Sequence, residues 1–217
     1  LERDLARWLI SELRLSDEGS AFSPLYLEWS FGFPLEGKED EKSTEKTLDL
    51  EKEGQFLRLG GRIDRIDYSE EGFYQALDYK TSTIPENNDL LNFLDFQIPI
   101  YLLAIQELLC QEGEKVLGGG YCSLKNGKRD GGLWQLKYKD KIVHRSSGKI
   151  KGNLDENEWE VYFAQVKERL FAYLDQIKAG RFYLNPQKCT SYCEFKTVCR
   201  FDPLQIAERG GEINEQP

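Results

Sequence analysis

GGRIDRID at residues 60–67 and, after a turn, ALDYKT at residues 76–81 are the stretches from which the fold of this chain can be worked out. The SEEG segment at residues 69–72 is a turn signal, and the flanking runs from Gln55 to Tyr68 and from Phe73 to Thr81 are β-like. The sequence therefore predicts two strands joined by a turn, with acidic and basic side chains on both.

This hairpin brings two carboxylates and one lysine together. With the turn centred near Glu71, Asp64 lies about opposite Asp78, whichever turn type forms. Asp78 and Lys80 are two residues apart on a strand, so they point the same way. Close like charges are costly without a cation, and Mg²⁺ would accept both carboxylates, the Tyr79 carbonyl, waters and a phosphate. Lys80 would then acidify a metal-bound water or neutralise charge on the phosphate.

The same spacing has a simpler interpretation, which a bare D-x-K pattern favours. In it, the charged side chains form cross-strand ion pairs on an exposed face of the sheet. The residues concerned are Arg62, Asp64, Arg65, Asp67, Asp78 and Lys80. Spacing alone does not decide between a metal site and these ion pairs.

Around the hairpin, apolar spacing predicts further strands and helices. Asp95 is a candidate cap and Pro99 fits only near a first helical turn, whereas Asp155 and Glu158 resemble a capping box. We predict helices over 1–14, 90–110 and 159–177, the last ending at Gly180, and strands over 25–33, 118–124 and 133–138. The expected fold is one α/β domain over residues 1–217, a mixed central sheet flanked by helices, with a cysteine-bearing tail at residues 186–202.

Composition excludes several classes of protein. With 217 residues, 40% of them hydrophobic, the chain can build a core, and it has no apolar run long enough for a membrane span and no signal peptide. We therefore expect a cytoplasmic protein. The net charge of −9 argues against a plain nucleic-acid-binding module but not against an enzyme that uses carboxylates to hold metal ions. The chain begins inside a predicted helix and contains no Met, so we expect further sequence upstream.

Taken together, Asp64, the Asp78-Tyr79-Lys80 triplet and Gln97-x-x-x-Tyr101 resemble the PD-(D/E)XK nuclease superfamily in its RecB-like branch. The resemblance implies a restriction-endonuclease-like fold in which Asp64 and Asp78 bind the metal and Lys80 is catalytic. Gln97 and Tyr101 would project from one face of the following helix. Without the other motifs, Tyr101 would be interpreted as a core residue and Gln97 as solvent-facing.

A narrower resemblance covers roughly residues 24–202. Pro24-x-x-x-Glu28-x-x-Phe31-Gly32 and the segment CEFKTVCRFD at residues 193–202 are similar to the C-terminal nuclease domain of the AddB family, the second subunit of bacterial AddAB helicase–nucleases. This implies an Mg²⁺- or Mn²⁺-dependent exonuclease that acts on single-stranded DNA ends in double-strand-break repair. It also implies a helicase–nuclease partner subunit and ATP bound elsewhere in the complex. The alternative is a catalytically silent nuclease fold that binds DNA ends or another subunit.

Cysteines gather near the C-terminal end, whereas Cys110 and Cys122 are isolated and interpreted as buried. In the resembled family, three C-terminal cysteines and one upstream cysteine hold a [4Fe–4S] cluster, and Cys189, Cys193 and Cys199 occupy the C-terminal positions. The first spacing is C-x3-C instead of C-x2-C, and the upstream cysteine is absent from this chain. Because the fourth ligand would have to come from outside this chain, we expect the cluster in the full-length protein. Bound zinc and free thiols are the alternatives.

The family also places a histidine or acidic metal ligand on an upstream helix. The only histidine, His144, follows the D-x-K triplet and is interpreted as a surface residue. Glu28 is a possible substitute ligand, but pairing with Arg62 is the favoured interpretation.

Overall fold

Strands β4 (Gly61–Ser69) and β5 (Phe73–Lys80) form the predicted antiparallel hairpin at the centre of a larger sheet. The structure is a computed structural model that describes residues 2–17, 21–34, 40–81, 84–125, 127, 129, 131–141 and 153–182. The chain divides into two compact units, Leu1–Tyr173 and Leu174–Pro217. The sheet and the elements packed on it belong to the first unit, and the second is described only up to residue 182.

The six-stranded sheet has the order β1-β4-β5-β6-β7-β8. Both neighbours of β4 are antiparallel to it, whereas β5 and β6 run parallel because helices connect them. The sheet is therefore mixed, as predicted. The remaining strands are β1 (Phe22–Phe31), β6 (Lys115–Ser123), β7 (Gly132–Gln135) and β8 (Asn153–Leu154).

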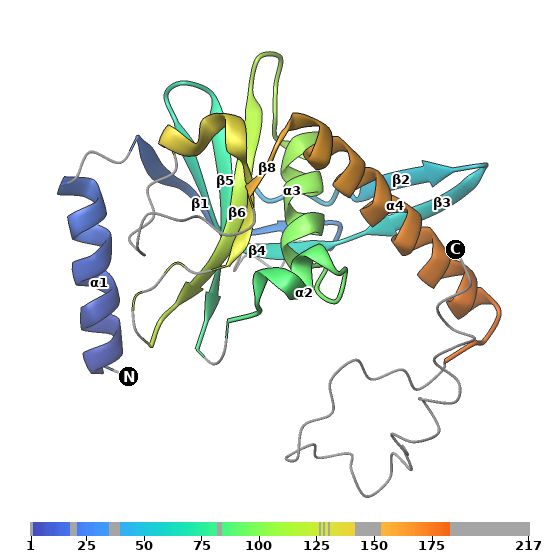
Figure 1. The fold of residues 1–217 in the computed structure, drawn as a ribbon, viewed down its shortest axis with the longest axis horizontal. Helices are drawn as coiled ribbons and strands as arrows, with labels where there is room; N and C mark the ends of the chain where they lie inside the picture. Colours follow the sequence, from blue (N-terminus) through green and yellow to red (C-terminus); the bar gives the residue numbers. More distant parts are fainter. Residues whose placement is uncertain are drawn as a thin grey trace, which may run out of the picture. The chain divides into compact units, whose positions relative to one another are not determined.

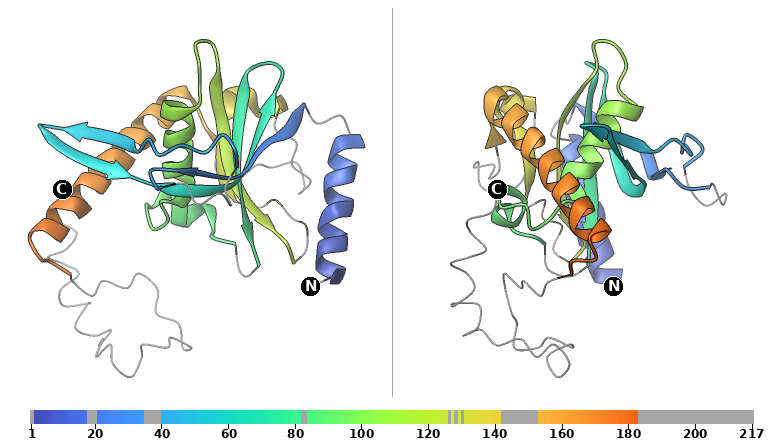
Figure 2. Two further views of the ribbon diagram at one scale, coloured as in Figure 1. Left: turned by 180° about the vertical axis from the view of Figure 1, so that it is seen from behind. Right: turned by 90° about the vertical axis from the view of Figure 1, so that its right-hand side faces the viewer.

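A separate hairpin precedes β4. The predicted run from Gln55 to Tyr68 is divided at Gly60, because β3 (Gln55–Leu59) pairs with β2 (Leu48–Lys52) and not with the main sheet. A Cβ atom at residue 60 would lie 3.0 Å from the Phe31 carbonyl oxygen and 3.1 Å from the Phe33 ring, so a larger residue would fit only if these neighbours shifted slightly. Figure 2 shows this hairpin as a ribbon that reaches out from the main sheet.

The predicted helix over residues 90–110 is wrong at its N-terminal end. The structure has a short helix α2 (Asn87–Leu91), a break, and then α3 (Gln97–Leu108). The chain turns within the break, where Phe93 has a positive φ of 58°. The N-cap residue of α3 is Phe96, and Asp95, one residue before it, accepts the Gln97 N–H through Oδ1 at 2.8 Å. Pro99 falls in the first turn of α3 as expected.

Helix α3 lies over β5 and β6 (Figure 1), with an almost continuous run of buried residues from Ile98 to Ile105. The close packing depends on Gly119 of β6. A Cβ atom there would lie 2.9 Å from the Ala76 carbonyl oxygen and 3.0 Å from Leu102 Cδ2. The glycine run in β6 thus allows the helix to settle against the two strands that carry the motif residues.

The other helices largely match the prediction. Helix α1 (Glu2–Asp17) begins the chain, and α4 (Glu156–Lys178) opens on the predicted capping box, in which Asp155 and Glu158 exchange hydrogen bonds of 2.8 and 2.9 Å. The predicted strand over residues 133–138 ends at Gln135, and a 3₁₀ helix, η1 (Leu136–Lys141), follows. None of the described helices is long and apolar enough to cross a membrane.

Candidate active site

Asp64 is held at the edge where β4 meets the end of β5. The strand register pairs Arg65 with Leu77, so the next position places Asp64 opposite Asp78, as the turn signal predicted. Asp64 Oδ2 accepts the backbone N–H of Tyr79 at 2.8 Å. This bond ties the first carboxylate of the motif directly to the D-x-K triplet.

Asp78 and Lys80 form an ion pair on the same face of β5. Lys80 Nζ lies 2.6 Å from Asp78 Oδ2, and Asp78 is almost fully buried, at 2% exposure. Burial raises the pKa of Asp78; the ammonium of Lys80 opposes that rise, and the nearby charge of Asp64 adds to it. The site therefore holds a desolvated carboxylate beside a second carboxylate and one cation.

Gln97 joins this pair to α3. Its Oε1 accepts a hydrogen bond from Lys80 at 2.7 Å, and its Nε2 donates to Asp78 Oδ1 at 2.6 Å and to the Tyr101 hydroxyl at 2.9 Å. Burial raises the pKa of Tyr101 to about 12, so its hydroxyl stays protonated near neutral pH. The five residues of the sequence motif thus converge, and the interpretation of Gln97 as solvent-facing is wrong.

Two further residues complete the surroundings of Lys80. The Tyr121 hydroxyl of β6 donates to Asp95 Oδ2 at 2.5 Å, and the Tyr121 ring lies 5.1 Å from Lys80 Nζ. Sequence reasoning identified Asp95 only as a cap and missed Tyr121. The only available signal was an aromatic residue directly after three glycines, which indicates no particular chemistry.

The donor set suits a small divalent cation. Asp78 Oδ2 is buried and lies 2.6 Å from the Lys80 ammonium, whose single charge does not balance both Asp78 and Asp64. Asp64 supplies the second carboxylate from the neighbouring strand. Among the described residues, no three side chains of the His, Cys, Asp or Glu type gather as a metal cluster. Two carboxylates fit Mg²⁺, which usually keeps several waters.

The exposed ion-pair interpretation fails for three of its members, which are Asp78, described above, and Asp67 and Arg65. Asp67 is 1% exposed and Arg65 is 5% exposed, and their mutual ion pair lies on the buried side of β4. Glu28, which has a positive φ of 55°, lies 3.9 Å from the nearest guanidinium nitrogen of Arg62, which agrees with the favoured pairing.

Of the cysteines and the histidine, only Cys110 and Cys122 lie among the described residues. Cys189, Cys193, Cys199 and His144 lie outside the described residues. Cys122 is buried and Cys110 half-buried, and burial raises the pKa of both thiols.

The sequence matches the PD-(D/E)XK nuclease superfamily over residues 2–200. This chain belongs to that superfamily. The α/β fold with its mixed central sheet, and the placement of Asp64 and the D-x-K triplet on adjacent strands, are what the membership leads one to expect. The PD-(D/E)XK match covers all of the described residues and extends to residue 200, beyond Cys199.

Similar proteins within the superfamily carry helicase and nuclease names. The chain is 29% identical over 67% of its length to an ATP-dependent helicase/deoxyribonuclease subunit from Streptococcus uberis, covering 16% of that protein. It is 26% identical over 92% of its length to the protein of the same name from Ruminiclostridium cellulolyticum, covering 21% of it. The exonuclease/helicase subunit RexB of Lactococcus lactis subsp. cremoris is 23% identical over 98% of this chain, which covers 22% of RexB. The chain therefore spans about a fifth of the length of these relatives.

Proposed function

We propose that this PD-(D/E)XK chain is a metal-dependent nuclease domain that hydrolyses DNA phosphodiester bonds, acting as an exonuclease on single-stranded ends. The observation that carries the proposal is the arrangement of Asp64 and the buried Asp78 on adjacent strands, next to the Lys80 ammonium. Two carboxylates this close carry more negative charge than one ammonium balances, so a divalent cation would stabilise them.

Asp64, Asp78 and the Tyr79 carbonyl would hold Mg²⁺ or Mn²⁺. When bound, the metal ion would polarise a phosphate oxygen and make a neighbouring water more acidic. The protein's own part is to keep the two carboxylates on adjacent strands, where the Tyr79 N–H fixes the rotamer of Asp64.

Lys80, Gln97 and Tyr101 would act on the nucleic acid. Lys80 already sits between Asp78 and Gln97, so a small rotation of its ammonium would place it against a phosphate oxygen, where its charge would stabilise the transition state. Gln97 and Tyr101, one helical turn apart on α3, would position the strand.

The names of the relatives suggest the setting. Those proteins are described as ATP-dependent helicase/deoxyribonuclease subunits, and this chain covers only a fifth of each. We propose that the domain works within such a protein, next to a partner subunit, with ATP bound elsewhere and DNA ends as substrate. The [4Fe–4S] cluster at Cys189, Cys193 and Cys199 remains a prediction from the sequence.

A cleavage assay on end-labelled single-stranded DNA with Mg²⁺ or Mn²⁺ tests the proposal. The parent should release labelled product, Asp78→Asn and Lys80→Gln should be slower by about 10³-fold, and the exposed-carboxylate control Asp175→Asn should match the parent. Circular single-stranded DNA should resist cleavage if the activity needs an end. If the parent protein is folded and binds Mn²⁺ but does not cleave the DNA, the catalytically silent alternative is favoured instead.

A further inference from the structure

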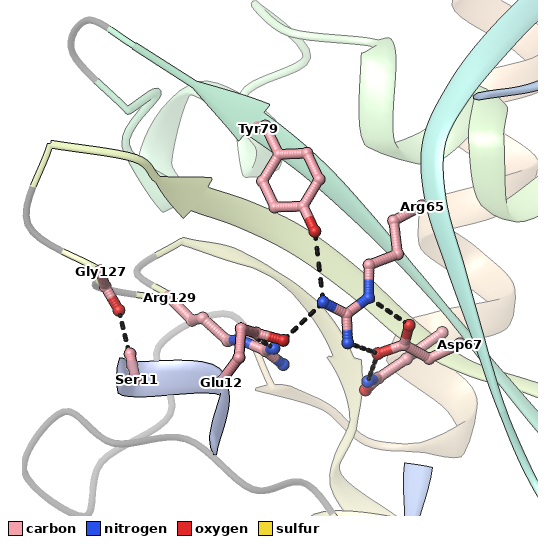
Figure 3. Close-up of polar contacts among 8 residues, drawn as sticks. Ser11, Glu12, Arg65, Asp67, Tyr79, Gly127 and Arg129 are labelled. Carbon is pink, nitrogen blue, oxygen red and sulfur yellow. Dashed lines mark hydrogen bonds and ion pairs between the residues drawn. The ribbon is translucent and has the colours of Figure 1, made fainter. Parts of the chain in front are cut away.

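The reverse face of the hairpin carries a buried ionic cluster that the proposed chemistry does not use (Figure 3). Side chains alternate along a strand, so Arg65 and Tyr79 point away from the face that holds Asp64 and Asp78. Arg65 donates from Nε to Asp67 Oδ1 at 2.5 Å and from one terminal nitrogen to Asp67 Oδ2 at 3.0 Å. The other terminal nitrogen reaches the Tyr79 hydroxyl at 3.2 Å.

Helix α1 closes this cluster through Glu12. One Glu12 oxygen lies 2.5 Å from Arg65 and the other lies 2.5 Å from Arg129. The side chains of both arginines are 10% exposed or less, and among the described residues Arg129 Nε has no hydrogen-bond acceptor. The two carboxylates of Glu12 and Asp67 therefore balance two buried guanidinium groups. Without the charge of Glu12, one positive charge would remain in a desolvated place.

Helix α1 makes two further contacts: the Ser11 hydroxyl donates to the Gly127 carbonyl oxygen at 3.3 Å (Figure 3), and Trp8 meets the D-x-K triplet. The Trp8 ring meets the Tyr79 ring edge-on, with the centroids 5.5 Å apart. In contrast, Leu5, Leu9 and Leu13 of the same helix are between 48% and 65% exposed. The helix is thus held by Trp8, the Glu12 ion pairs and the Ser11 hydrogen bond, and its leucine stripe contributes little to this contact.

We propose that Glu12 is a positioning residue for the active site. By pairing with both Arg65 and Arg129, the Glu12 carboxylate keeps Arg65 on the Tyr79 hydroxyl. It also keeps Trp8 against the Tyr79 ring. Tyr79 lies between Asp78 and Lys80 in sequence, and its backbone N–H holds Asp64 on the opposite face. A shift of the Tyr79 side chain therefore moves the backbone that aligns both carboxylates. The inference rests on the proposed nuclease function, but the hydrogen–deuterium exchange measurement that tests it first does not depend on that function.

The test compares Glu12→Gln with the exposed-residue control Glu2→Gln in the full-length protein. Hydrogen–deuterium exchange should become faster in α1 and in the segment containing Tyr79 for Glu12→Gln only. Calorimetric binding of Mn²⁺ should weaken by about tenfold, as is typical when a residue supporting a metal ligand is removed. The Mn²⁺ concentration for half-maximal cleavage should rise with it, while the rate at saturating Mn²⁺ changes little.

A compensating variant separates positioning from simple loss of fold. Glu12→Gln combined with Arg129→Gln restores the charge balance of the cluster, so Mn²⁺ affinity and Tyr79 exchange should return most of the way to the parent. If α1 exchanges faster in Glu12→Gln but Mn²⁺ affinity and Tyr79 exchange match the parent, the positioning role is overturned. It is also overturned if the double variant is no better than Glu12→Gln. If the parent itself neither binds Mn²⁺ nor cuts DNA, the proposed function fails, and the exchange data alone still show whether α1 and Tyr79 are coupled.

Discussion

Asp78 is buried, although its proposed role in binding a metal ion requires it to be charged. Burial raises its pKa, so in the metal-free protein its ionised form is less stable in the folded state than in the unfolded chain. Lys80 offsets only part of that cost, since the pKa of Asp78 stays raised although the ammonium lies 2.6 Å away. A carboxylate kept under these conditions indicates a function that needs the charge.

Asp78→Asn should therefore leave the metal-free protein at least as stable as the parent at neutral pH. Because a raised carboxyl pKa makes the ionised form a cost above that pKa, removing the charge removes the cost. Saturating Mn²⁺ should raise the parent Tm by about 2–5 °C and leave Asp78→Asn unchanged. Differential scanning calorimetry with and without EDTA measures both effects; an equal Mn²⁺-induced rise in the variant would contradict the ligand role of Asp78.

Tyr121 offers a matched pair of variants. Tyr121→Phe keeps the ring beside Lys80 and loses only the hydrogen bond to Asp95, which should lower the free energy of unfolding by about 1–2 kcal/mol. Tyr121→Leu also removes the aromatic face, so Lys80 loses a contact worth about 0.5–2 kcal/mol. The DNA cleavage rate should fall more in the leucine variant than in the phenylalanine variant. Equal rates in the two variants would show that the ring does not hold Lys80.

At the scale of elements, the active site depends on how closely α3 and α1 approach the two faces of the hairpin. Helix α3 needs a position on β6 that carries no side chain, and Gly119 provides it. Helix α1 depends on charge instead, since burial raises the pKa of Glu12 but Arg129 and Arg65 outweigh that effect and hold it below its usual range.

Gly119→Ala tests the approach of α3. The new methyl group would lie 2.9 Å from the Ala76 carbonyl oxygen, and backbone cannot yield as a flexible side chain can. We expect a loss of about 1–3 kcal/mol in the free energy of unfolding, measured by urea denaturation. Ala164→Gly, at an exposed position in α4, should cost only about 1 kcal/mol. A Gly119→Ala protein as stable as the parent would mean that β6 has room for a methyl group between β5 and α3.

The docking of α1 should depend on pH in the acid range. Because the folded-state pKa of Glu12 is lowered, its contribution is present above its unfolded value of about 4.5 and is lost as pH falls through the folded value. Hydrogen exchange of α1, corrected for the intrinsic rate, should therefore increase below pH 4.5 in the parent. In Glu12→Gln it should already be fast at neutral pH and change less. A parent profile as flat as that of the variant would contradict the role of the carboxylate.

For the whole molecule, the net charge of −9 limits what the chain can do alone. DNA affinity derives largely from basic groups that displace counterions, and acidic surfaces oppose it. At about 0.15 M salt, the isolated chain should bind a single-stranded oligonucleotide at least about tenfold more weakly than the full-length protein does. Fluorescence anisotropy measures both affinities, and equal values would show that this domain needs no help from the rest of the protein.

The sequence predicted what depends on near neighbours along the chain. Turn length and strand alternation predicted the hairpin register and the convergence of Asp64 with Asp78. The spacing of polar residues before helices predicted the role of Asp95 and the capping box of α4. The sequence could not predict that the 90–110 segment breaks at Phe93, where tertiary packing imposes a positive φ. Nor could it predict the pairing of Glu12 with Arg65, 53 residues apart, or the place of Tyr121, because no local pattern encodes such contacts.

Strand β5 presents different chemistry on its two faces, and this limits how its length can change. Inserting one residue between Phe73 and Asp78 would turn the Tyr79 ring toward Asp64 and drive Asp78 and Lys80 against Trp8 and Arg65. Inserting two residues would restore every side chain to its face. Among natural variants of this domain, an insertion or deletion of one residue in the first half of β5 should therefore come with a β-bulge, like the register shift between Tyr74 and Gln75 in the pairing with β6.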